Sequence, residues 1–264
     1  MDIVSKRGWY MLLSSIIIIP GIISLLIPPA FSPGIDFSSG SAFEVIFENE
    51  ISEEEVRKAL VVVGHSDARI QKFASDSVFV RTKELQDGER GSIETELDAS
   101  VAKVSSFSKV ETVSAEVAGE TVRNAVIAVM LAAVGILAYI TWAFRHIPNS
   151  FRYGVSALFA LVHDVLIIMG IFSILGKVID LEVNAMFIVG LLAVVGYSVN
   201  DTIVLFDRIR ENIARNIDRP LAQSVNIGIM ESIGRSLGTS LTTCYAITAL
   251  ILIGGTNLRE FLLV

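Results

Sequence analysis

The stretch from Ala193 to Asn212 places an ionisable side chain inside a sequence as apolar as a membrane helix. It begins with small and branched apolar residues, carries Asp201 near its middle, and becomes charged after Phe206. A carboxylate in a bilayer-spanning segment is costly to insert, and such a residue generally faces a partner, a cavity or an ion path. Any fold of this chain must therefore provide a partner or a route for Asp201.

The composition indicates a membrane protein with several spans. The chain has 264 residues, of which 52% are hydrophobic, and its mean hydropathy is +0.63. Several apolar runs approach the roughly 20 residues that cross a hydrocarbon core of about 30 Å. A net charge of -7 gives no support to nucleic-acid binding. The single Cys244 excludes a disulfide framework or a cysteine metal site within one chain.

The apolar segments predict five complete spans and the beginning of a sixth. The first span follows Lys6 and Arg7 without a clear cleavage pattern, so we expect residues 1–31 to form an uncleaved anchor that ends at Pro28-Pro29. The other spans lie in residues 119–264, and Phe261 to Val264 is too short to cross a bilayer, so we expect a truncated or partial form of a longer protein. The complete spans cover about Tyr10–Ile27, Thr121–Phe144, Val155–Leu175, Val183–Phe206 and Leu237–Ile253.

Residues 32–118 form the polar part of the chain and are expected to fold into a small α+β domain outside the membrane. A Ser-Glu-Glu-Glu sequence at Ser52 predicts a capping box at the start of a helix. The predicted order of elements is β-α-β-β-α-β, which is typical of a ferredoxin-like split unit; an irregular α+β cap is the alternative. The predicted elements are Ser41–Glu48, Ser52–Val62, Asp67–Phe73, Ser77–Thr82, Gly91–Ser105 and Val110–Glu116.

Basic residues predict the orientation of the spans. They precede the first span, lie between the second and third, and lie between the fourth and fifth. If the spans alternate in direction, all three groups fall on one side, which the positive-inside rule identifies as the cytoplasm. The N-terminus is then cytoplasmic and the polar domain faces outward. The groups are Lys6 and Arg7; Arg145, His146 and Arg152; and Arg208, Arg210, Arg215 and Arg219.

A cation is available to balance Asp201. Arg235 precedes the fifth span, and at helical spacing it shares a face with Thr239, Thr242 and Ala246. A neighbouring cation lowers the pKa of a carboxyl group while desolvation raises it. The pair could therefore switch between a bound state and a protonated, released state, so that a proton biases a helix rearrangement. The alternative is a static Asp201–Arg235 pair that only fixes packing.

Other polar residues are candidates for supporting roles. His163 and Asp164 in the third span, with Asn200 in the fourth, are candidates to extend or brace a proton relay. In the fifth span, hydroxyl groups could hold water or serve only in helix packing; they belong to Thr239, Ser240, Thr242 and Thr243. Asp207, Arg208 and Arg210 are expected to anchor the cytoplasmic interface. No nucleophile and base stand at a spacing that indicates an enzyme, and no cofactor is expected.

The sequence from Gly196 to Asn212, Gly-Tyr-Ser-Val-Asn-Asp-Thr-Ile-Val-Leu-Phe-Asp-Arg-Ile-Arg-Glu-Asn, resembles the signature of the SecF family of protein-export membrane proteins. Further matches follow the family order over essentially the whole chain. They are Gly34-Ile-Asp-Phe-Ser-Ser-Gly40, Ala160-Leu-Val-His-Asp-Val165, Arg235-Ser-Leu-Gly-Thr-Ser-Leu-Thr-Thr243, and Gly254-Gly followed by Leu258-Arg259. Ser39 stands where the family has glycine, which a turn tolerates unless a positive φ is needed.

The resemblance implies a function. It implies six spans, membership of the resistance-nodulation-division superfamily, and a place in the cytoplasmic membrane beside SecD, the SecYEG channel and YajC. The pair with SecD would use the proton-motive force to promote export of unfolded polypeptides, with Asp201 as the proton-linked acid and Arg235 as its essential arginine. The alternatives are a small-molecule or lipid exporter of that superfamily, which about 85 polar residues leave little room for, and a purely structural partner subunit.

Overall fold

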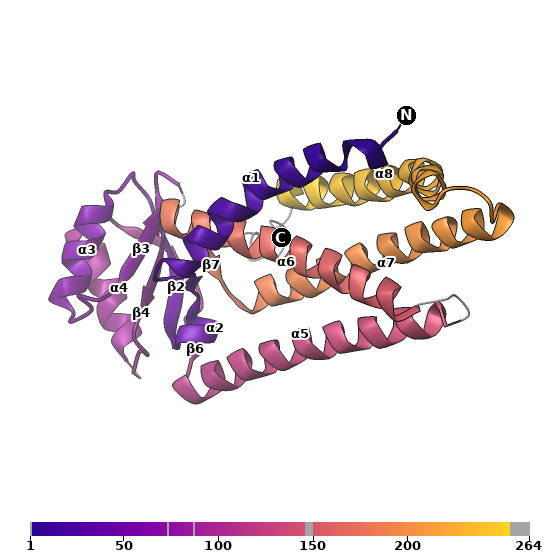
Figure 1. Cartoon of the computed structure of the whole chain (residues 1–264). Coiled ribbons are helices and arrows are strands. Elements are labelled where there is room, and N and C mark those ends of the chain that lie inside the picture. Colours follow the sequence, from indigo (N-terminus) through magenta and orange to yellow (C-terminus); the bar gives the residue numbers. More distant parts are fainter. Residues whose placement is uncertain (1, 73, 87, 146–149, 254–264) are drawn as a thin grey trace. The chain divides into compact units, whose positions relative to one another are not determined.

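The computed structural model describes residues 2–72, 74–86, 88–145 and 150–253. The chain divides into two compact units (Figure 1). The helical unit comprises Met1–Ser32 and Ala125–Val264, and the α/β unit comprises Pro33–Asn124. This division follows the change from apolar to polar sequence.

The helical unit is built from long helices. A short 3-10 helix, η1 (Val4–Lys6), leads into α1 (Arg7–Leu26). Four described helical segments are long and apolar enough to cross a membrane, which supports a multi-pass membrane protein: Val4–Leu26, Ala115–Ala143, Phe151–Val178 and Ala185–Arg215. The remaining elements of this part of the chain are β1 (Ser32–Pro33), α5 (Ala115–Ala143), α6 (Ser150–Val178), β7 (Glu182–Val183), α7 (Ala185–Arg215) and α8 (Leu221–Ile253).

Each of the first four predicted spans coincides with one of these four segments to within two residues at the ends where it extends past the segment. The fifth, Leu237–Ile253, lies in α8, which is not among them. The predicted beginning of a sixth span at Phe261–Val264 lies outside the described residues. The structure therefore supports four spans of the five that the sequence predicts.

Two helices extend well beyond the apolar segments that revealed them. α7 continues from Phe206 to Arg215, and α8 begins at Leu221, far before the predicted start of its span. Charged side chains three or four residues apart stabilise a solvated helix, and Arg208, Glu211 and Arg215 form such pairs along α7. The hydropathy profile thus marked the apolar part of each helix and not its ends.

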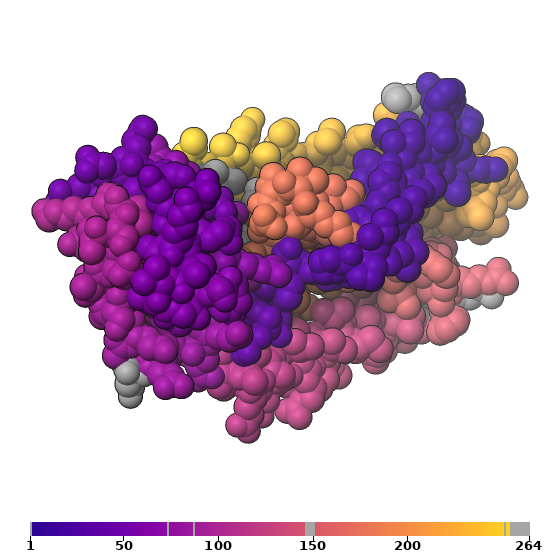
Figure 2. Space-filling view, turned by 90° about the vertical axis from the view of Figure 1, so that its left-hand side faces the viewer, coloured from indigo at the N-terminus to yellow at the C-terminus, as the bar shows by residue number. Residues whose placement is uncertain are grey.

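α1 and α6 run parallel in a constant register. Ser24 and Ser173 share a hydrogen bond at 2.8 Å, and Ser14 contacts His163, both at a separation of 149 residues. Gly21 and Gly170 keep the same separation, and a Cβ atom on Gly21 would lie 2.8 Å from Gly170 Cα. The two backbones therefore touch, and Figure 2 shows α1 lying along α6.

The other neighbouring helices run antiparallel. Phe144 at the end of α5 stacks on Tyr153 near the start of α6, with ring centroids 5.5 Å apart. Phe172 of α6 contacts Phe187 near the start of α7 at 4.5 Å. These contacts show that successive helices alternate in direction, as the spans of a multi-pass membrane protein do.

The turn between α7 and α8 lies at the same end of the helical unit as the start of α1. Asn212 of α7 donates to Glu231 of α8 at 2.8 Å. The backbone N–H of Ile3 donates to the side chain of Asn226 on α8 at 2.7 Å. Because the helices alternate, the described members of the three basic groups of the sequence gather at one end of this unit, which we call the basic end.

The α/β unit holds a five-stranded antiparallel sheet. The strand order is β3-β4-β2-β5, and β6 also pairs with β2. The capping box is present as predicted. The side chain of Ser52 accepts from a backbone N–H in the first turn of α3, and the side chain of Glu55 accepts from the backbone N–H of Ser52. The elements are α2 (Ile35–Ser38), β2 (Gly40–Phe47), α3 (Glu53–Val62), β3 (Arg69–Lys72), β4 (Ser77–Thr82), α4 (Glu89–Ser100), β5 (Val104–Phe107) and β6 (Glu111–Val113).

The predicted helix Gly91–Ser105 is wrong at its C-terminal end. α4 ends at Ser100, and Val104–Phe107 form the strand β5. The side chain of Asp98 accepts from the backbone N–H of Val104 at 2.8 Å, which turns the chain out of the helix. The predicted strand Val110–Glu116 is correspondingly shorter, at Glu111–Val113.

The core of the α/β unit lies between the sheet and helices α3 and α4. Alternate residues of the sheet, Phe43, Val45 and Phe47, are almost fully buried, as are Leu60 of α3 and Leu97 of α4. Burial of apolar area is the main favourable term in folding. This core defines a unit with its own hydrophobic centre.

A tight turn precedes the central strand β2. Ser39 has φ = 62° and Gly40 has φ = 122°, and a Cβ atom on Gly40 would lie 2.5 Å from the carbonyl oxygen of Thr82. Only glycine fits at position 40. Ser39 also adopts the left-handed backbone that favours glycine. The turn therefore requires a positive φ at position 39, which is the condition under which serine is less well tolerated than the glycine of the family.

Candidate functional site

Asp201 lies on α7 and is half-buried. Arg235 lies on α8 and is exposed, and its backbone carbonyl accepts from the hydroxyl of Thr239 at 3.0 Å. Within the described residues neither charged side chain forms an ion pair or a hydrogen bond. The structure therefore does not join the predicted pair in this conformation.

The register of α7 and α8 explains this separation. The hydroxyls of Tyr197 and Thr243 are 2.6 Å apart, and the two helices are antiparallel. Asp201 is therefore level with Thr239. Arg235 comes four residues before Thr239, which places it about 6 Å away along the axis of α8. The face of α8 that packs on α7 contains Ser232, Ser236, Thr239 and Thr243, with Arg235 turned outward.

His163 and Asp164 do form a polar site. The ring Nδ1 of His163 lies 2.9 Å from Asp164 Oδ1, and Ser198 Oγ on α7 donates to Asp164 Oδ2 at 2.6 Å. On the other side, Ser14 Oγ on α1 contacts His163 Nε2. We call these four side chains the polar chain. It links three helices and lies near the middle of each.

The sequence predicted only the two central members of the polar chain. Ser14 and Ser198 were missed as site residues because an isolated serine in an apolar span carries no chemical signal of its own. Their relevance depends on α1 and α7 lying on either side of α6, which is a tertiary relationship. The hydroxyls could have been found only once that packing was known.

The chemistry of the acceptors assigns the protons of the polar chain. A carboxylate only accepts hydrogen bonds, so His163 Nδ1–H donates to Asp164. The other ring nitrogen, Nε2, is then the acceptor in the neutral imidazole, and Ser14 O–H donates to it. The His163 and Asp164 side chains keep 42% and 39% of their surface accessible. Atoms that can exchange a proton are thus lined up and reachable.

Three hydroxyls of α8 donate within their own helix, and that of Thr243 also contacts Tyr197 of α7. Thr239 donates to Arg235 O, Thr242 donates to Gly238 O, and Thr243 donates to Thr239 O, each at about 3 Å. Ser240 and Thr242 are exposed, as is Asn200 on α7. Such back-bonding is usual for serine and threonine inside helices. A water-holding role for these residues stays a prediction.

The predicted interface anchors lie on the extension of α7 beyond its apolar part. Arg208 pairs with Glu211 at 2.7 Å, and Asp207 pairs with Arg210. The side chains of Asp207, Arg208 and Arg210 are about half exposed. They lie at the basic end of the helical unit, where the sequence placed the interface. Exposed pairs of this kind contribute little to stability.

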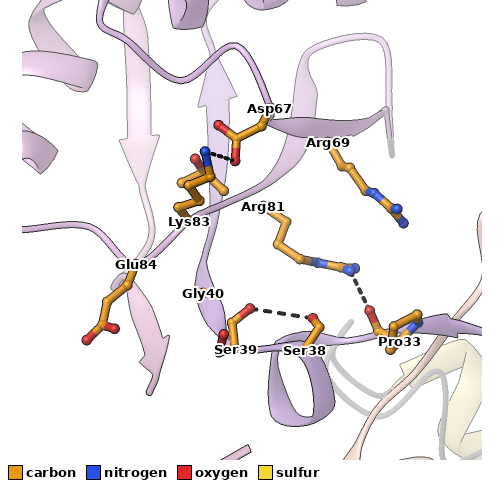
Figure 3. Close-up of a pocket in the computed structure, with 10 residues that line it drawn as sticks. Pro33, Ser38, Ser39, Gly40, Asp67, Arg69, Arg81, Lys83 and Glu84 are labelled. Carbon is orange, nitrogen blue, oxygen red and sulfur yellow. Dashed lines mark hydrogen bonds and ion pairs between the residues drawn. The ribbon is translucent and has the colours of Figure 1, made fainter. Parts of the chain in front are cut away.

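The α/β unit carries a pocket of about 270 Å³ next to the turn at Ser39 (Figure 3). Arg81 points along it and donates to the carbonyl of Pro33 at 2.8 Å. Burial, and secondarily repulsion from Arg69, lowers the pKa of Arg81 to about 10. Lys83 is paired with Asp67 at 3.4 Å. These contacts indicate a structural role for the charges in this pocket.

Comparison with known proteins places these features in a family. Residues 93–264 match the family described as "Protein export membrane protein SecD/SecF, C-terminal". The Protein translocase subunit SecF of Thermobaculum terrenum is 39% identical, with 100% of this chain and 86% of that protein aligned. The subunit of the same name from Anaerolinea thermophila is 35% identical over the same shares of the two proteins.

A solved structure agrees with the sequence comparison. The crystal structure of SecDF from Thermus thermophilus, described as a translocon-associated membrane protein, superposes with a TM-score of 0.85 at 32% identity. The match covers 100% of this chain and 35% of that longer chain. The resemblance drawn from the motifs is thereby confirmed. By sequence over its whole length and by fold, the chain belongs to the SecF family of protein-export membrane proteins.

Proposed function

We propose that the chain is an accessory subunit of the Sec protein translocase that acts with a SecD partner. The observation that carries this proposal is the alignment of the whole chain with proteins named Protein translocase subunit SecF. The similar solved chain is a SecDF protein, which supports SecD as the partner. SecYEG, YajC and an unfolded polypeptide in transit complete the proposed assembly.

We infer that the subunit uses the proton-motive force and that Asp201 is the acid that takes up the proton. Asp201 is a half-buried carboxylate in a helix apolar enough to cross a membrane, and such residues mark ion and proton paths. It lies one helical turn from Ser198 of the polar chain. The unpaired arrangement of Asp201 and Arg235 fits the released state of the proposed switch.

We further infer the orientation of the subunit in the cytoplasmic membrane. The basic end of the helical unit is assigned to the cytoplasm by the positive-inside rule, which places the N-terminus there. The α/β unit then lies outside. Its strand order and two helices support the ferredoxin-like split unit that the sequence suggested.

Two other functions are separable from this one. A small-molecule exporter of the wider superfamily is disfavoured because the α/β unit, Pro33–Asn124, is one small domain with one core. A purely structural subunit would keep its SecD partner in place but would not respond to protons. Loss of the carboxylate at Asp201 distinguishes this structural role from the proposed one.

The test is an export assay in inverted membrane vesicles that contain SecYEG, SecD and this chain. Polypeptide export is measured with and without a proton gradient. We expect Asp201→Asn to remove most of the gradient-dependent stimulation while the complex with SecD still assembles. Asp207→Asn is the matched control, because Asp207 lies on the same helix but is exposed and paired with Arg210. Full stimulation with Asp201→Asn would rule out the proton role.

A further inference from the structure

The polar chain is a second place in the helical unit where a proton could bind. Asp201 forms no hydrogen bond or ion pair with the described residues, whereas His163 and Asp164 are held on both sides. Two donors already converge on the carboxylate of Asp164, namely the His163 ring and the Ser198 hydroxyl. Each carboxylate oxygen of Asp164 therefore already accepts a hydrogen bond, and the remaining proton acceptor of the chain is Nε2 of His163, whose partner Ser14 can either donate or accept.

We infer that His163 is a proton-binding residue of this protein, positioned by Asp164 and sensed by α1 through Ser14. The ligand is a proton from water, which bonds to Nε2 and converts the neutral imidazole into a cation. This inference deepens the proposed function, since it adds a proton site beside Asp201. It depends on the contacts of the polar chain and not on the pairing of Asp201 with Arg235.

The groups that face His163 favour this role. Asp164 provides the counter-charge for the imidazolium at 2.9 Å from Nδ1. On the helices packed against α6, the nearest titratable groups by helical position are Tyr10 on α1 and Tyr197 and Asp201 on α7. Tyr10 and Asp201 each lie about one turn from the hydroxyl of the polar chain toward the basic end, and Tyr197, next to Ser198, is hydrogen-bonded to Thr243 of α8 at 2.6 Å. Lys177 is more than three turns away on α6, where it donates to the carbonyl of Ile27 at 2.9 Å. The only cation within one turn of the polar chain, among the described residues of α1, α6 and α7, would be His163 itself.

Proton uptake at Nε2 reverses one hydrogen bond. In the neutral state Ser14 donates to Nε2, and in the cation Nε2–H donates to Ser14 Oγ. The hydroxyl hydrogen of Ser14 must then turn to another acceptor. The carbonyl one turn earlier on α1 is available to a serine, as Ser15 shows by donating to Met11 O at 2.8 Å. Protonation of His163 on α6 thereby changes the hydrogen bond made by the Ser14 side chain on α1.

The structure suggests why α1 would respond as one body with α6. The two helices touch at Gly21 and Gly170 and share the hydrogen bond between Ser24 and Ser173. Closely packed elements move as bistable units and not by continuous deformation. A change at Ser14 can therefore alter how α1 is held along the whole contact.

The test is the pH dependence of the imidazole ¹⁵N signals in the full chain, reconstituted with unlabelled SecD in lipid vesicles. The chain has three histidines, so the signals of His163 are identified by their loss in His163→Gln. Spectra are recorded from about pH 8 down to about pH 5, and we expect both ring nitrogens of His163 to change from the neutral to the protonated signal over this range. Signals that stay neutral throughout this range would overturn the inference.

Four variants separate a positioning role from a merely structural one. In Asp164→Asn we expect the protonated signal of His163 to be weaker at each pH in this range, because the counter-charge is lost. Asp207→Asn should leave it unchanged. Ser14→Ala should shift the Nε2 signal of the neutral ring, whereas Ser15→Ala, whose hydroxyl donates to Met11 O of its own helix, should not. Identical spectra for Ser14→Ala and Ser15→Ala would contradict the role of α1.

This measurement does not depend on export. If His163 titrates as expected but export ignores the proton gradient, the proposed function fails and the proton site stands. If export depends on the gradient and on Asp201 while His163 stays neutral, the function stands and this inference fails.

Discussion

Gly21 of α1 and Gly170 of α6 meet backbone to backbone. A Cβ atom built on Gly21 would lie 2.8 Å from Gly170 Cα, and one built on Gly170 would lie 2.7 Å from Gly21 Cα. Small residues let membrane helices approach this closely. The contact fixes the parallel register of the two helices and, with it, the approach of Ser14 to His163.

Gly170→Ala should therefore separate α1 from α6. The added methyl group meets backbone atoms that cannot rotate away, and overpacking of this kind costs about 1–3 kcal/mol. The free energy of unfolding in detergent should fall by that amount. Gly135→Ala on α5 is the matched control, because no atom lies within 4 Å of its Cβ position. Equal stability of the two variants would disprove the close contact.

A disulfide should form across the same contact. Ser24 Oγ and Ser173 Oγ are 2.8 Å apart, so in a Cys244→Ser background the double variant Ser24→Cys, Ser173→Cys should crosslink under mild oxidation. Proteolysis between the two helices followed by non-reducing electrophoresis detects the bond. Ser24→Cys with Ile171→Cys should remain reduced, because Ile171 is 42% exposed on another face of α6.

Asp201 and Arg235 should behave as independent residues when no gradient is present. Because they form no ion pair in this conformation, the effects of Asp201→Asn and Arg235→Gln on the free energy of unfolding should add to within about 0.5 kcal/mol. A double-mutant cycle in detergent or in de-energised vesicles measures this. A coupling energy well above that value would show that the resting protein holds them as a pair.

Ser39→Gly should stabilise the α/β unit. Ser39 has φ = 62° and ψ = 170°, a combination open almost only to glycine, and residues held there cost of order 1–3 kcal/mol. We expect slower hydrogen exchange at the β2–β4 amides. Ser38→Gly serves as the control and should have the opposite effect, because the Ser38 hydroxyl donates to Gly34 O at 2.9 Å. No change in either variant would argue against strain in this turn.

Ser52→Ala should destabilise the α/β unit by about 1 kcal/mol, the usual effect of losing an N-cap. Its hydroxyl accepts from the backbone N–H of Glu54 at 3.2 Å in the first turn of α3. Hydrogen exchange at the amides of α3, measured as the protein is heated, reports the loss of stability. Glu54→Gln should have little effect, because the Glu54 side chain is 76% exposed and its ion pair with Lys58 is long, at 3.4 Å.

The sequence alone determined the features that depend on local physics. Apolar length predicted the four spans that the structure supports, and the Ser52 capping box predicted where α3 begins. The cost of an acid in a membrane helix singled out Asp201 before any fold was known. Helix ends and the strand β5 were misplaced, because charge pairing along α7 and the hydrogen bond from Val104 to Asp98 override the local pattern.

The tertiary structure decided which side chains meet. Ser14 and Ser198 joined His163 and Asp164 only because α1 and α7 flank α6 in a particular register. Arg235 points away from Asp201 because the rotation of α8 presents other residues to α7. Register and rotation are set by contacts between residues distant in sequence, and periodicity within one helix carries no information about either.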